Sequence, residues 1–558
     1  MKRNMTGSAG RFRRDDVWSE GMEGGFMAKR EHWLTYDSTV GELYDNPVGH
    51  DALAKVLLQL GLPEKVLTNR VISGLTLRTI ARLAKGKLGM DFFDSLLGLV
   101  ELEKDKPCAS KGKITPKWWK EAVFYQIYPR SFCDGNGDGT GDLLGIINKL
   151  DYLQRLGVDA LWLSPIYDSP NDDNGYDIRD YDKIMEEFGT MEDFERLLAE
   201  VHKRGMRLIM DLVVNHTSDE HIWFKKASQG DPVYRDYYFF REDDKSHRPP
   251  NNWTSFFSGP AWKYEESAGS WALHLFSQKQ MDLNWENPKV REEITAMVNR
   301  WLDKGVDGFR MDVINYISKV KGLPDGNETI GKLMGFTGME HYGNNCWMSL
   351  FYNNHDNPRM ISKITKDTSH HTALSKLLAL MQLTLKGTPF LFQGDEMGLA
   401  NYPFTSMEQI TDVEAKGYYE EHIQKEPEGK VFSDILAGTR EHARVPLPWN
   451  KRVPSCYAGL YQAPKREVFC AYRRLLRLRH EEKAFVYGSF RVLCRKKDRF
   501  VYARALEGRV YVVDCNLGRK SCRAFLLKGQ WEVIYDTEKR GEKRRLRGYE
   551  ARILRYGG

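Results

Sequence analysis

The stretch "VREEITAMVNRWLDKGVDGFRMDVI" (residues 290–314) decides the fold, because it joins an amphipathic helix to a short apolar strand. The spacing predicts a helix over 290–305 and a strand over 306–314. From Gly308 onward this strand contains two charged residues, Arg310 and Asp312. Charged side chains are seldom placed in an apolar strand for packing, so this pair indicates a functional site.

The same alternation of helix and strand runs through the preceding 170 or so residues. It predicts parallel strands joined by helical crossovers. Four βα steps in this order indicate the first half of a (β/α)8 TIM barrel, and the pattern resumes with a helix at 370–387 and a strand at 388–398. The earlier strands are expected at 122–132, 158–167 and 206–216, and the earlier helices at 143–157 and 190–205.

The composition and the hydrophobic periodicity of the sequence change several times along the chain, which predicts several domains. Residues 38–61 combine a capping box of Thr39 and Glu42 with leucines at helical spacing, which indicates a small helical unit without chemistry of its own. We expect a disordered leader (1–34), a helical module (35–105), a linker (106–116), a barrel (117–480) with an inserted subdomain (217–285) after the third strand, and a C-terminal antiparallel β-domain (481–558).

Composition is that of an ordinary soluble globular protein. The 558 residues are 41% hydrophobic, and 83 basic against 77 acidic residues leave a net charge of +6. Basic runs such as 538–547 are expected to be solvated loops, so we predict no nucleic-acid partner. The chain shows neither an apolar run of about 20 residues nor the apolar core of a signal peptide, so we expect no membrane contact and a cytoplasmic location. Eight cysteines without a CxxC pair indicate reduced thiols.

Polar residues cluster where the predicted strands end, and these ends face the catalytic mouth of a barrel. A single aspartate there is more often structural, but clusters on successive strands predict one site. The candidates are Asp173 and Tyr176; Asp211, Asn215 and His216; Arg310 and Asp312; and His355, Asp356 and Arg359.

Carboxylates beside arginine, histidine and aromatic residues, without a cysteine nucleophile or paired metal-binding histidines, indicate glycoside cleavage. A retaining glycosidase needs an ionised carboxylate as nucleophile and a protonated one about 5–5.5 Å away as acid/base. Arg310 lies two residues before Asp312 and therefore on the same face of the strand, where it can orient that carboxylate. We therefore predict Asp312 as the nucleophile. Tyr176 is expected to stack on the sugar, and His216, His355 and Asp356 to bind its hydroxyls.

From about residue 117 to the end, the chain resembles the alpha-amylase family of glycoside hydrolases (family 13), in its oligo-1,6-glucosidase and alpha-glucosidase branch. The motifs that carry the resemblance are "DLVVNH" (211–216), "QMDLNWENP" (280–288), "GFRMDVIN" (308–315), "NNHDNPR" (353–359) and "GTPFLFQGDEMG" (387–398). The resemblance implies Asp312 as nucleophile and Asp356 as transition-state stabiliser. It also implies a glucosyl subsite of Asp173, Tyr176, His216, Arg310, His355 and Arg359, and Val313 resembles members that favour α-1,6 bonds.

The loop "DGNGDGTGD" (134–142) alternates oxygen ligands with glycines, as a calcium loop does. On spacing alone a surface turn is an equal interpretation. The resemblance implies structural calcium, or magnesium, held by Asp134, Asn136, Asp138 and Asp142 with the carbonyl of Thr140. No organic cofactor is expected.

Two departures from the family pattern concern the aglycone side and the proton donor. "RVPLPWN" (444–450) stands where the branch has an "RTPMQW"-like segment. The family also places its acid/base glutamate in a "GE" motif after the fifth strand, but here only 44 residues separate Asp312 from Asp356. Two βα units need more than this, since each crossover alone takes at least about 10–12 residues. Strands five and six are predicted to be missing. Glu328 and Glu340 are the only glutamates of the interval, and Glu340 could approach the site from a loop, although an ordinary loop glutamate is the more frequent case in such a context. The acid/base role therefore stays unassigned.

Two functions of different classes follow. The first is hydrolysis of terminal α-glucosidic bonds, α-1,6 before others, in short oligosaccharides by a retaining mechanism that the missing acid/base weakens. The second is a sugar-binding or scaffold protein derived from an alpha-glucosidase that no longer turns over its ligand. Among substrates, isomalto-oligosaccharides, maltose, sucrose and trehalose 6-phosphate stay open, and so does the oligomeric state.

Overall fold

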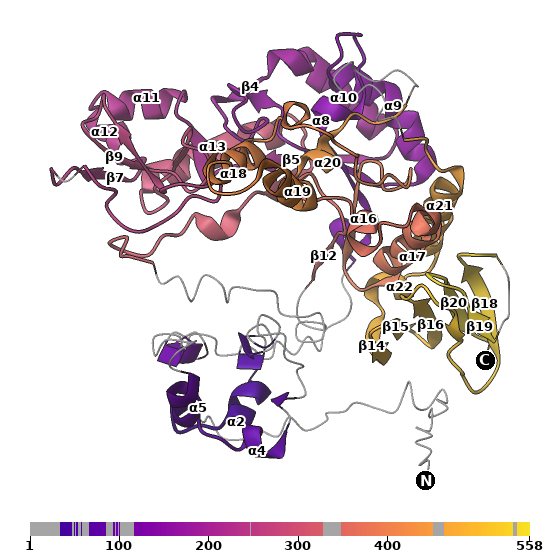
Figure 1. Cartoon of the computed structure of the whole chain (residues 1–558). Helices are drawn as coiled ribbons and strands as arrows, with labels where there is room; N and C mark the ends of the chain where they lie inside the picture. Colours follow the sequence, from indigo (N-terminus) through magenta and orange to yellow (C-terminus); the bar gives the residue numbers. More distant parts are fainter. Residues whose placement is uncertain are drawn as a thin grey trace. The chain divides into compact units, whose positions relative to one another are not determined.

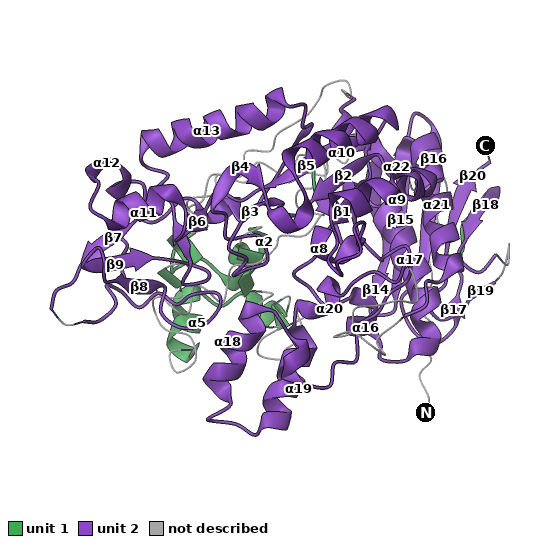
Figure 2. Cartoon of the chain, turned by 90° about the horizontal axis from the view of Figure 1, so that it is seen from above, with its two compact units in different colours: residues 1–115, 326–348, 526–529 green, residues 116–325, 349–525, 530–558 purple. Residues whose placement is uncertain are grey.

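The structure is a computed structural model of the chain. It describes residues 34–46, 49–50, 52–53, 57, 66–67, 69–84, 93–94, 96–98, 100, 116–245, 247–326, 347–449, 462–539 and 544–557. The chain divides into two compact units, one of residues 1–115, 326–348 and 526–529, and one of residues 116–325, 349–525 and 530–558 (Figure 2). Apart from Leu34 and Pro116, the predicted leader and linker lie outside the described residues.

The described part of the first unit is helical. Its helices are α2 (Val40–Asp45), α4 (Arg70–Ser73) and α5 (Leu77–Ala84). The capping box at the start of α2 is confirmed, because Glu42 N lies 3.2 Å from Thr39 Oγ1 and Thr39 N lies 2.7 Å from Glu42 Oε2. Val40, Leu43, Leu77 and Phe93 share a buried apolar cluster, which is the packing that the leucine spacing predicts.

The second unit is built on a sheet of parallel strands. Its order is β11-β5-β2-β1-β13-β12, with β12 and β11 at the two edges; β5 and β12 are labelled in Figure 1. Every pairing in this sheet is parallel, as the βα pattern predicts. The strands are β1 (Phe124–Ile127), β2 (Ala160–Leu163), β5 (Arg207–Leu212), β11 (Gly308–Met311), β12 (Ser349–Leu350) and β13 (Thr388–Phe392). Residues 327–346, where further barrel strands would lie, are outside the described residues, so the missing strands stay a prediction.

Helices cover this sheet and begin at local capping signals. Asp142 caps α9 (Leu143–Leu156), and its side chain accepts from Gly145 N; Gly157 ends the helix at φ +99°. A capping box of Thr190 and Asp193 begins α10 (Met191–Lys203). Asn287 caps α13 (Pro288–Asp303), whose first residue is a proline. The remaining helices around the sheet are α7 (Trp118–Glu121), α8 (Pro129–Phe132), α16 (Met360–Ile364) and α17 (His371–Thr384).

The segment between β5 and α13 forms small antiparallel sheets. Strand β9 (Ser270–Leu273) lies between β7 (Phe240–Glu242) and β8 (Trp262–Glu265). Strand β10 (Gln280–Asp282) pairs with β6 (His216–Ser218), which places Asp282 opposite His216. The far end of this segment thereby returns to the end of β5. The segment also contains α11 (Ile222–Ser228) and α12 (Pro232–Arg235), and β3 (Tyr167–Asp168) pairs with β4 (Asp180–Ile184) before it.

The predicted C-terminal antiparallel sheet is confirmed. Its order is β14-β15-β16-β20-β18, from β14 (Ser489–Lys496), β15 (Arg499–Leu506), β16 (Arg509–Asn516), β18 (Trp531–Asp536) and β20 (Ala551–Tyr556), with β17 (Cys522–Arg523) and β19 (Arg545–Leu546) beside it. Buried Arg504 ties β15 to the helices, since its side chain donates to the carbonyls of Thr384 and Phe485. None of the helices in the described ranges has the length and apolar character that a bilayer crossing requires.

Helices after β13 complete this unit. They are α18 (Val413–His422), α19 (Glu428–Gly438), α20 (Glu441–Arg444), α21 (Arg466–Glu481) and α22 (Ala484–Tyr487). Ile410, Val431, Ile435 and Val445 form an apolar cluster that fixes the first three of them. This cluster positions arginines that point into the candidate site.

Candidate functional site

One arginine joins the carboxylates at the ends of two neighbouring strands. Arg310 in β11 is in register with Asp211 in β5. Its Nη1 lies 2.9 Å from Asp211 Oδ1 and 2.5 Å from Asp312 Oδ1. Both carboxylates are buried, with Asp211 fully enclosed and Asp312 7% exposed. The strand is shorter than predicted because Val313 takes a left-handed conformation at φ +35°, which turns the chain directly after Asp312.

The second carboxylate oxygen of Asp211, Oδ2, accepts two hydrogen bonds. The Tyr176 hydroxyl and the Trp162 indole N–H each donate to Asp211 Oδ2 at 3.0 Å. The guanidinium of Arg310 lies 4.9 Å above the Trp162 ring. Asp211 therefore acts as a fixed anchor for Arg310, and Asp312 is the carboxylate of the pair with the smaller set of protein partners.

The Tyr176 ring packs on His355. The two rings are 5.0 Å apart and 3° from parallel, and Tyr176 is 6% exposed. One face of this ring is therefore already covered by protein, so only its other face is left for the predicted stacking on a sugar.

His355 is oriented to donate to Asp356. Gln126 Nε2 lies 2.7 Å from His355 Nδ1, and His355 Nε2 lies 3.2 Å from Asp356 Oδ2. An amide N–H can only donate, so Nδ1 accepts and the ring proton is assigned to Nε2. Burial lowers the pKa of His355 to about 3, so the ring is neutral at physiological pH. A neutral histidine thus presents its N–H to the Asp356 carboxylate.

Two arginines flank Asp356 from the other side. Arg444 Nη2 lies 3.1 Å and Arg440 Nη1 lies 3.6 Å from Asp356 Oδ1. Burial raises the pKa of Asp356, but His355, Arg444 and Arg440 outweigh it and lower the pKa to about 2. Asp356 is therefore ionised throughout the physiological range.

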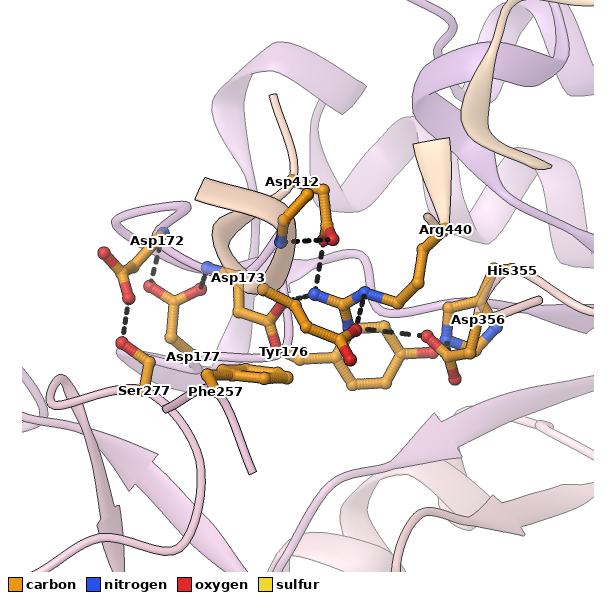
Figure 3. A network of polar contacts seen from close by, with 12 residues as sticks. Asp172, Asp173, Tyr176, Asp177, Phe257, Ser277, His355, Asp356, Asp412 and Arg440 are labelled. Carbon is orange, nitrogen blue, oxygen red and sulfur yellow. Dashed lines mark hydrogen bonds and ion pairs between the residues drawn. The ribbon is translucent and has the colours of Figure 1, made fainter. Parts of the chain in front are cut away.

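Arg440 connects the carboxylates of this network, which Figure 3 shows from close by. Its Nη2 lies 3.2 Å from Asp173 Oδ1 and also contacts Asp412, and its Nε lies 3.2 Å from Glu414 Oε2. The guanidinium lies 4.9 Å from the ring centre of Phe257. Arg440, which follows β13 in the chain, thereby joins the loop after β3, which carries Asp173, to the segment that carries Asp356.

Asp173 and His216 meet at Gln280 of β10. Gln280 Nε2 lies 3.2 Å from Asp173 Oδ2 and 3.1 Å from His216 Nε2. Burial raises the pKa of Asp173 to about 6 against the opposing effect of Arg440 and Arg444, and burial lowers the pKa of His216 to about 4. Asp177 supports the loop of Asp173, because its carboxylate accepts from the backbone N–H groups of Asp172 and Asp173 (Figure 3). It also accepts from Ser169 Oγ.

Asp312 and Asp356 are held in opposite electrostatic states. Burial raises the pKa of Asp312 to about 7, with Arg310 opposing the rise and the charges of Asp211 and Asp356 adding to it. Asp356 has the lowered pKa given above. Paired carboxylates whose environments separate their pKa values are a recurrent feature of acid/base and nucleophilic sites.

Most of the predicted site residues share this network, but Arg359 points elsewhere. The residues brought together are Asp173, Tyr176, Asp211, Asn215, His216, Arg310, Asp312, His355 and Asp356. Buried Arg359 donates from Nη1 to Gln393 O at 2.9 Å and pairs with Asp395 Oδ1 at 3.3 Å. It therefore fixes the segment after β13, and the structure shows it bonded there rather than to Asp312 or Asp356.

Sequence reasoning missed Arg440, Arg444, Asp412 and Glu414. The signal was "GTREHAR" (438–444), in which two arginines stand four residues apart at one turn of helix. Gln280 was also missed as a site residue, although its motif "QMD" contributes to the resemblance.

The predicted metal loop lies apart from this network. The carboxylate of Asp134 accepts from Gly137 N at 2.6 Å and Gly139 N at 2.9 Å, and Asp138 Oδ1 accepts from Thr140 N at 2.7 Å. Asp142 caps α9. In the described ranges, no three His, Cys, Asp or Glu side chains gather as metal ligands do. The donors are of the type that calcium prefers, but they must turn from the backbone N–H groups to bind it, so calcium stays a prediction.

Comparison with known proteins gives one family. The family described as "Alpha amylase, catalytic domain" matches residues 126–342 and 331–488. The oligo-1,6-glucosidase of Halalkalibacterium halodurans is 41% identical over 556 residues, which cover 79% of this chain and 99% of the relative. The glucan 1,6-alpha-glucosidase of Streptococcus pneumoniae is 38% identical over 498 residues, which cover 72% of this chain and 92% of the relative.

Solved structures agree with this result. The trehalulose synthase MutB from Pseudomonas mesoacidophila has a TM-score of 0.73 at 34% identity and covers 79% of this chain and all of its own. An isomaltulose synthase mutant from Erwinia rhapontici, in complex with its natural substrate sucrose, has the same score, identity and coverage. The chain therefore belongs to the alpha-amylase family, in the oligo-1,6-glucosidase branch of its glycoside hydrolases.

The alignments also show that the matched part of this chain is shorter than the relative it aligns with. The matched 79% of 558 residues is about 441 residues, whereas the H. halodurans alignment extends over 556, which leaves about 115 positions without a counterpart here. The family match falls into two pieces that overlap at residues 331–342. That overlap lies between Asp312 and Asp356.

Proposed function

We propose that this protein hydrolyses terminal α-1,6-glucosidic bonds of short oligosaccharides with retention of configuration. The observation that carries the proposal is the pair of strand-end carboxylates, Asp312 on Arg310 and Asp356 between His355 and Arg444. The choice of α-1,6 bonds rests on the names of the relatives, among them oligo-1,6-glucosidases and a glucan 1,6-alpha-glucosidase.

In this mechanism ionised Asp312 attacks the anomeric carbon of the terminal glucosyl unit and forms a covalent intermediate, which water then hydrolyses. Arg310 orients the attacking carboxylate through the contact from Nη1. Ionised Asp356 and the His355 N–H hold ring hydroxyls, and these bonds tighten as positive charge develops on the sugar. Asp173, His216 and Gln280 bind the far side of the same glucosyl unit.

We further propose that the leaving group receives little help from a general acid. The support is the interval of 44 residues between Asp312 and Asp356, and the break in the family match within it. The two glutamates of that interval, Glu328 and Glu340, lie outside the described residues. General acid catalysis contributes about 10²–10⁴ in rate, so cleavage of a natural glucoside should be slowed by that factor.

The experiment is to incubate the purified chain with isomaltose, maltose, sucrose and 4-nitrophenyl α-glucoside. We expect release of 4-nitrophenol and glucose, with the first-formed glucose in the α configuration by NMR. A β product would contradict retention. Trehalulose or isomaltulose from sucrose would move the activity toward that of the synthases found among the structural neighbours.

A sugar-binding protein without turnover is the second candidate, and the short interval after Asp312 is the observation that favours it. It predicts binding of isomaltose by calorimetry with no release of nitrophenol. Trehalose 6-phosphate is a weaker substrate candidate, because the arginines of the site already pair with carboxylates: Arg310 with Asp211 and Asp312, and Arg440 and Arg444 with Asp356 and Asp412.

A further inference from the structure

A basic cleft lies toward the amino ends of the parallel strands, away from the carboxyl ends that carry the candidate site. Its volume is about 1160 Å³, and its lining comes from the C-terminal end of α9, helix α21, Lys376 of α17 and the segment from Tyr535 to Lys539. We call it the α21 cleft. Helix α9 ends where the chain enters β2, at the amino ends of the parallel strands, whereas Asp312 and Asp356 follow the carboxyl ends of strands. None of the described residues that line the cleft belongs to the candidate site.

Positive charge is in excess in this cleft. Seven lysines and arginines line it, against three aspartates and glutamates. Two of the cations are in ion pairs, Lys376 Nζ at 2.8 Å from Glu538 and Arg477 Nε at 3.6 Å from Glu481. The other five form no ion pair with any residue in the described ranges: Arg155, Arg466, Arg473, Arg474 and Lys539. Unpaired cations gathered in a concave surface focus a positive potential on it.

The arginines of α21 form a row. Arg466, Arg473 and Arg477 are seven and four residues apart, which places them on one side of the helix. At a rise of about 1.5 Å per residue the row is about 16 Å long. The guanidinium of Arg474 lies 5.2 Å from the ring centre of Tyr535, and this contact limits its rotation. A row of this length fits a ligand that carries charges along its length better than a single anion.

The lining also narrows the class of ligand. Four of the five unpaired cations are arginines, whose planar donor groups match the oxygens of phosphate. Proteins that bind single-stranded nucleic acid stack the bases on accessible aromatic rings. Among the described residues that line the cleft, Tyr535 is the only tyrosine, tryptophan or phenylalanine; it is 5% exposed and already faces Arg474. The described lining offers charge contacts without a stacking surface.

We propose that the α21 cleft binds a linear chain of inorganic phosphate groups. Such a chain has an anionic group at every repeat and no base, so it matches a row of guanidiniums without aromatic platforms. The proposal does not depend on the hydrolytic function, since neither the residues nor the test involves a sugar.

The test is fluorescence anisotropy of end-labelled short-chain polyphosphate titrated with the full chain. The triple variant Arg466→Gln, Arg473→Gln and Arg474→Gln removes three cations of the cleft, all exposed. The control triple variant Arg82→Gln, Arg196→Gln and Arg523→Gln removes the same charge from exposed sites elsewhere. We expect the cleft variant to bind about tenfold more weakly or worse, and the control to stay within about twofold of the wild type.

Three outcomes would overturn the proposal. They are no binding by the wild type, equal weakening in both triple variants, and displacement of the label at equal charge concentration by an oligonucleotide or polyglutamate as readily as by unlabelled polyphosphate. Circular dichroism and the thermal midpoint check that each variant is folded. We expect both to be unchanged, because every substituted side chain is exposed.

Discussion

Arg310 donates a hydrogen bond to Asp312, two residues later in the chain, with 2.5 Å between Nη1 and Oδ1. The contact fixes the orientation of the Asp312 carboxylate but does not hold its pKa low, because burial and the charges of Asp211 and Asp356 raise the pKa to about 7. The nucleophile that we propose is thus well positioned but protonated in acid. The activity should therefore fall as the pH is lowered through the pKa of Asp312.

The pH dependence of kcat/KM for 4-nitrophenyl α-glucoside should have an acid limb with a midpoint near 7. Below this pH the protonated Asp312 cannot attack, so the rate should fall about tenfold per pH unit. Asp356, whose pKa is lowered to about 2, stays ionised over the same range. An acid limb centred near pH 4 would show that Arg310 outweighs burial at Asp312.

The rate should depend steeply on the leaving group. Without general acid assistance the departing oxygen leaves as an anion, so kcat/KM should fall by about 10²–10⁴ from 4-nitrophenyl to phenyl α-glucoside. The oligo-1,6-glucosidase of H. halodurans, which is longer than the matched part of this chain, is the control and should show a shallow dependence. A shallow dependence in this protein as well would mean that a proton donor is present, and Glu328 and Glu340 would then be the first residues to replace.

Replacement of Arg440 by glutamine should damage both sugar binding and stability. The change leaves the buried carboxylates of Asp173 and Asp412 with fewer cationic partners, and breaking a buried pair costs about 3–5 kcal/mol. We expect a lower thermal midpoint and a raised KM. Arg440→Lys should recover part of the stability, because it restores the charge but not the planar donor group. The exposed variant Arg196→Gln is the control and should unfold within about 0.5 kcal/mol of the wild type.

Calcium should raise the thermal midpoint if the loop of residues 134–142 binds it. A calcium concentration of 100 times Kd would stabilise the protein by about 2.7 kcal/mol. The double variant Asp134→Asn and Asp138→Asn should lose this shift, and the control Asp151→Asn on α9 should keep it. An equal shift of the thermal midpoint in both variants, or no shift in the wild type, would contradict calcium binding. The loop would then be a turn whose carboxylates are bonded only to its own backbone N–H groups.

Much of the sheet could be predicted because its signals are local. Strands β1, β2, β5 and β11 occur as short apolar runs, and each is followed or preceded by a helix with a capping residue of its own. The end of β11 was misplaced, since the left-handed turn at Val313 is adopted by a β-branched residue that gives no turn signal.

The candidate site could be predicted only where it lies on the strands. Asp211, Arg310, Asp312 and Asp356 follow apolar runs and are therefore visible in the sequence. Arg440 stands four residues before Arg444 in "GTREHAR", which marks the pair of arginines but not their partners: Asp173 is 267 residues away, and no local pattern indicates that contact. The cluster of α18, α19 and α20 that positions Arg440 is held by non-local apolar packing, which periodicity does not reveal.

The most direct test of the central claim measures nitrophenol release from 4-nitrophenyl α-glucoside by the wild type and by the variant Asp312→Asn. This substitution keeps the shape of the side chain but removes its charge. We predict measurable turnover by the wild type and a loss of at least about a thousandfold in the variant, because the covalent step needs the carboxylate. Turnover that survives in Asp312→Asn, or a folded wild type that binds isomaltose but releases no nitrophenol, would contradict the account.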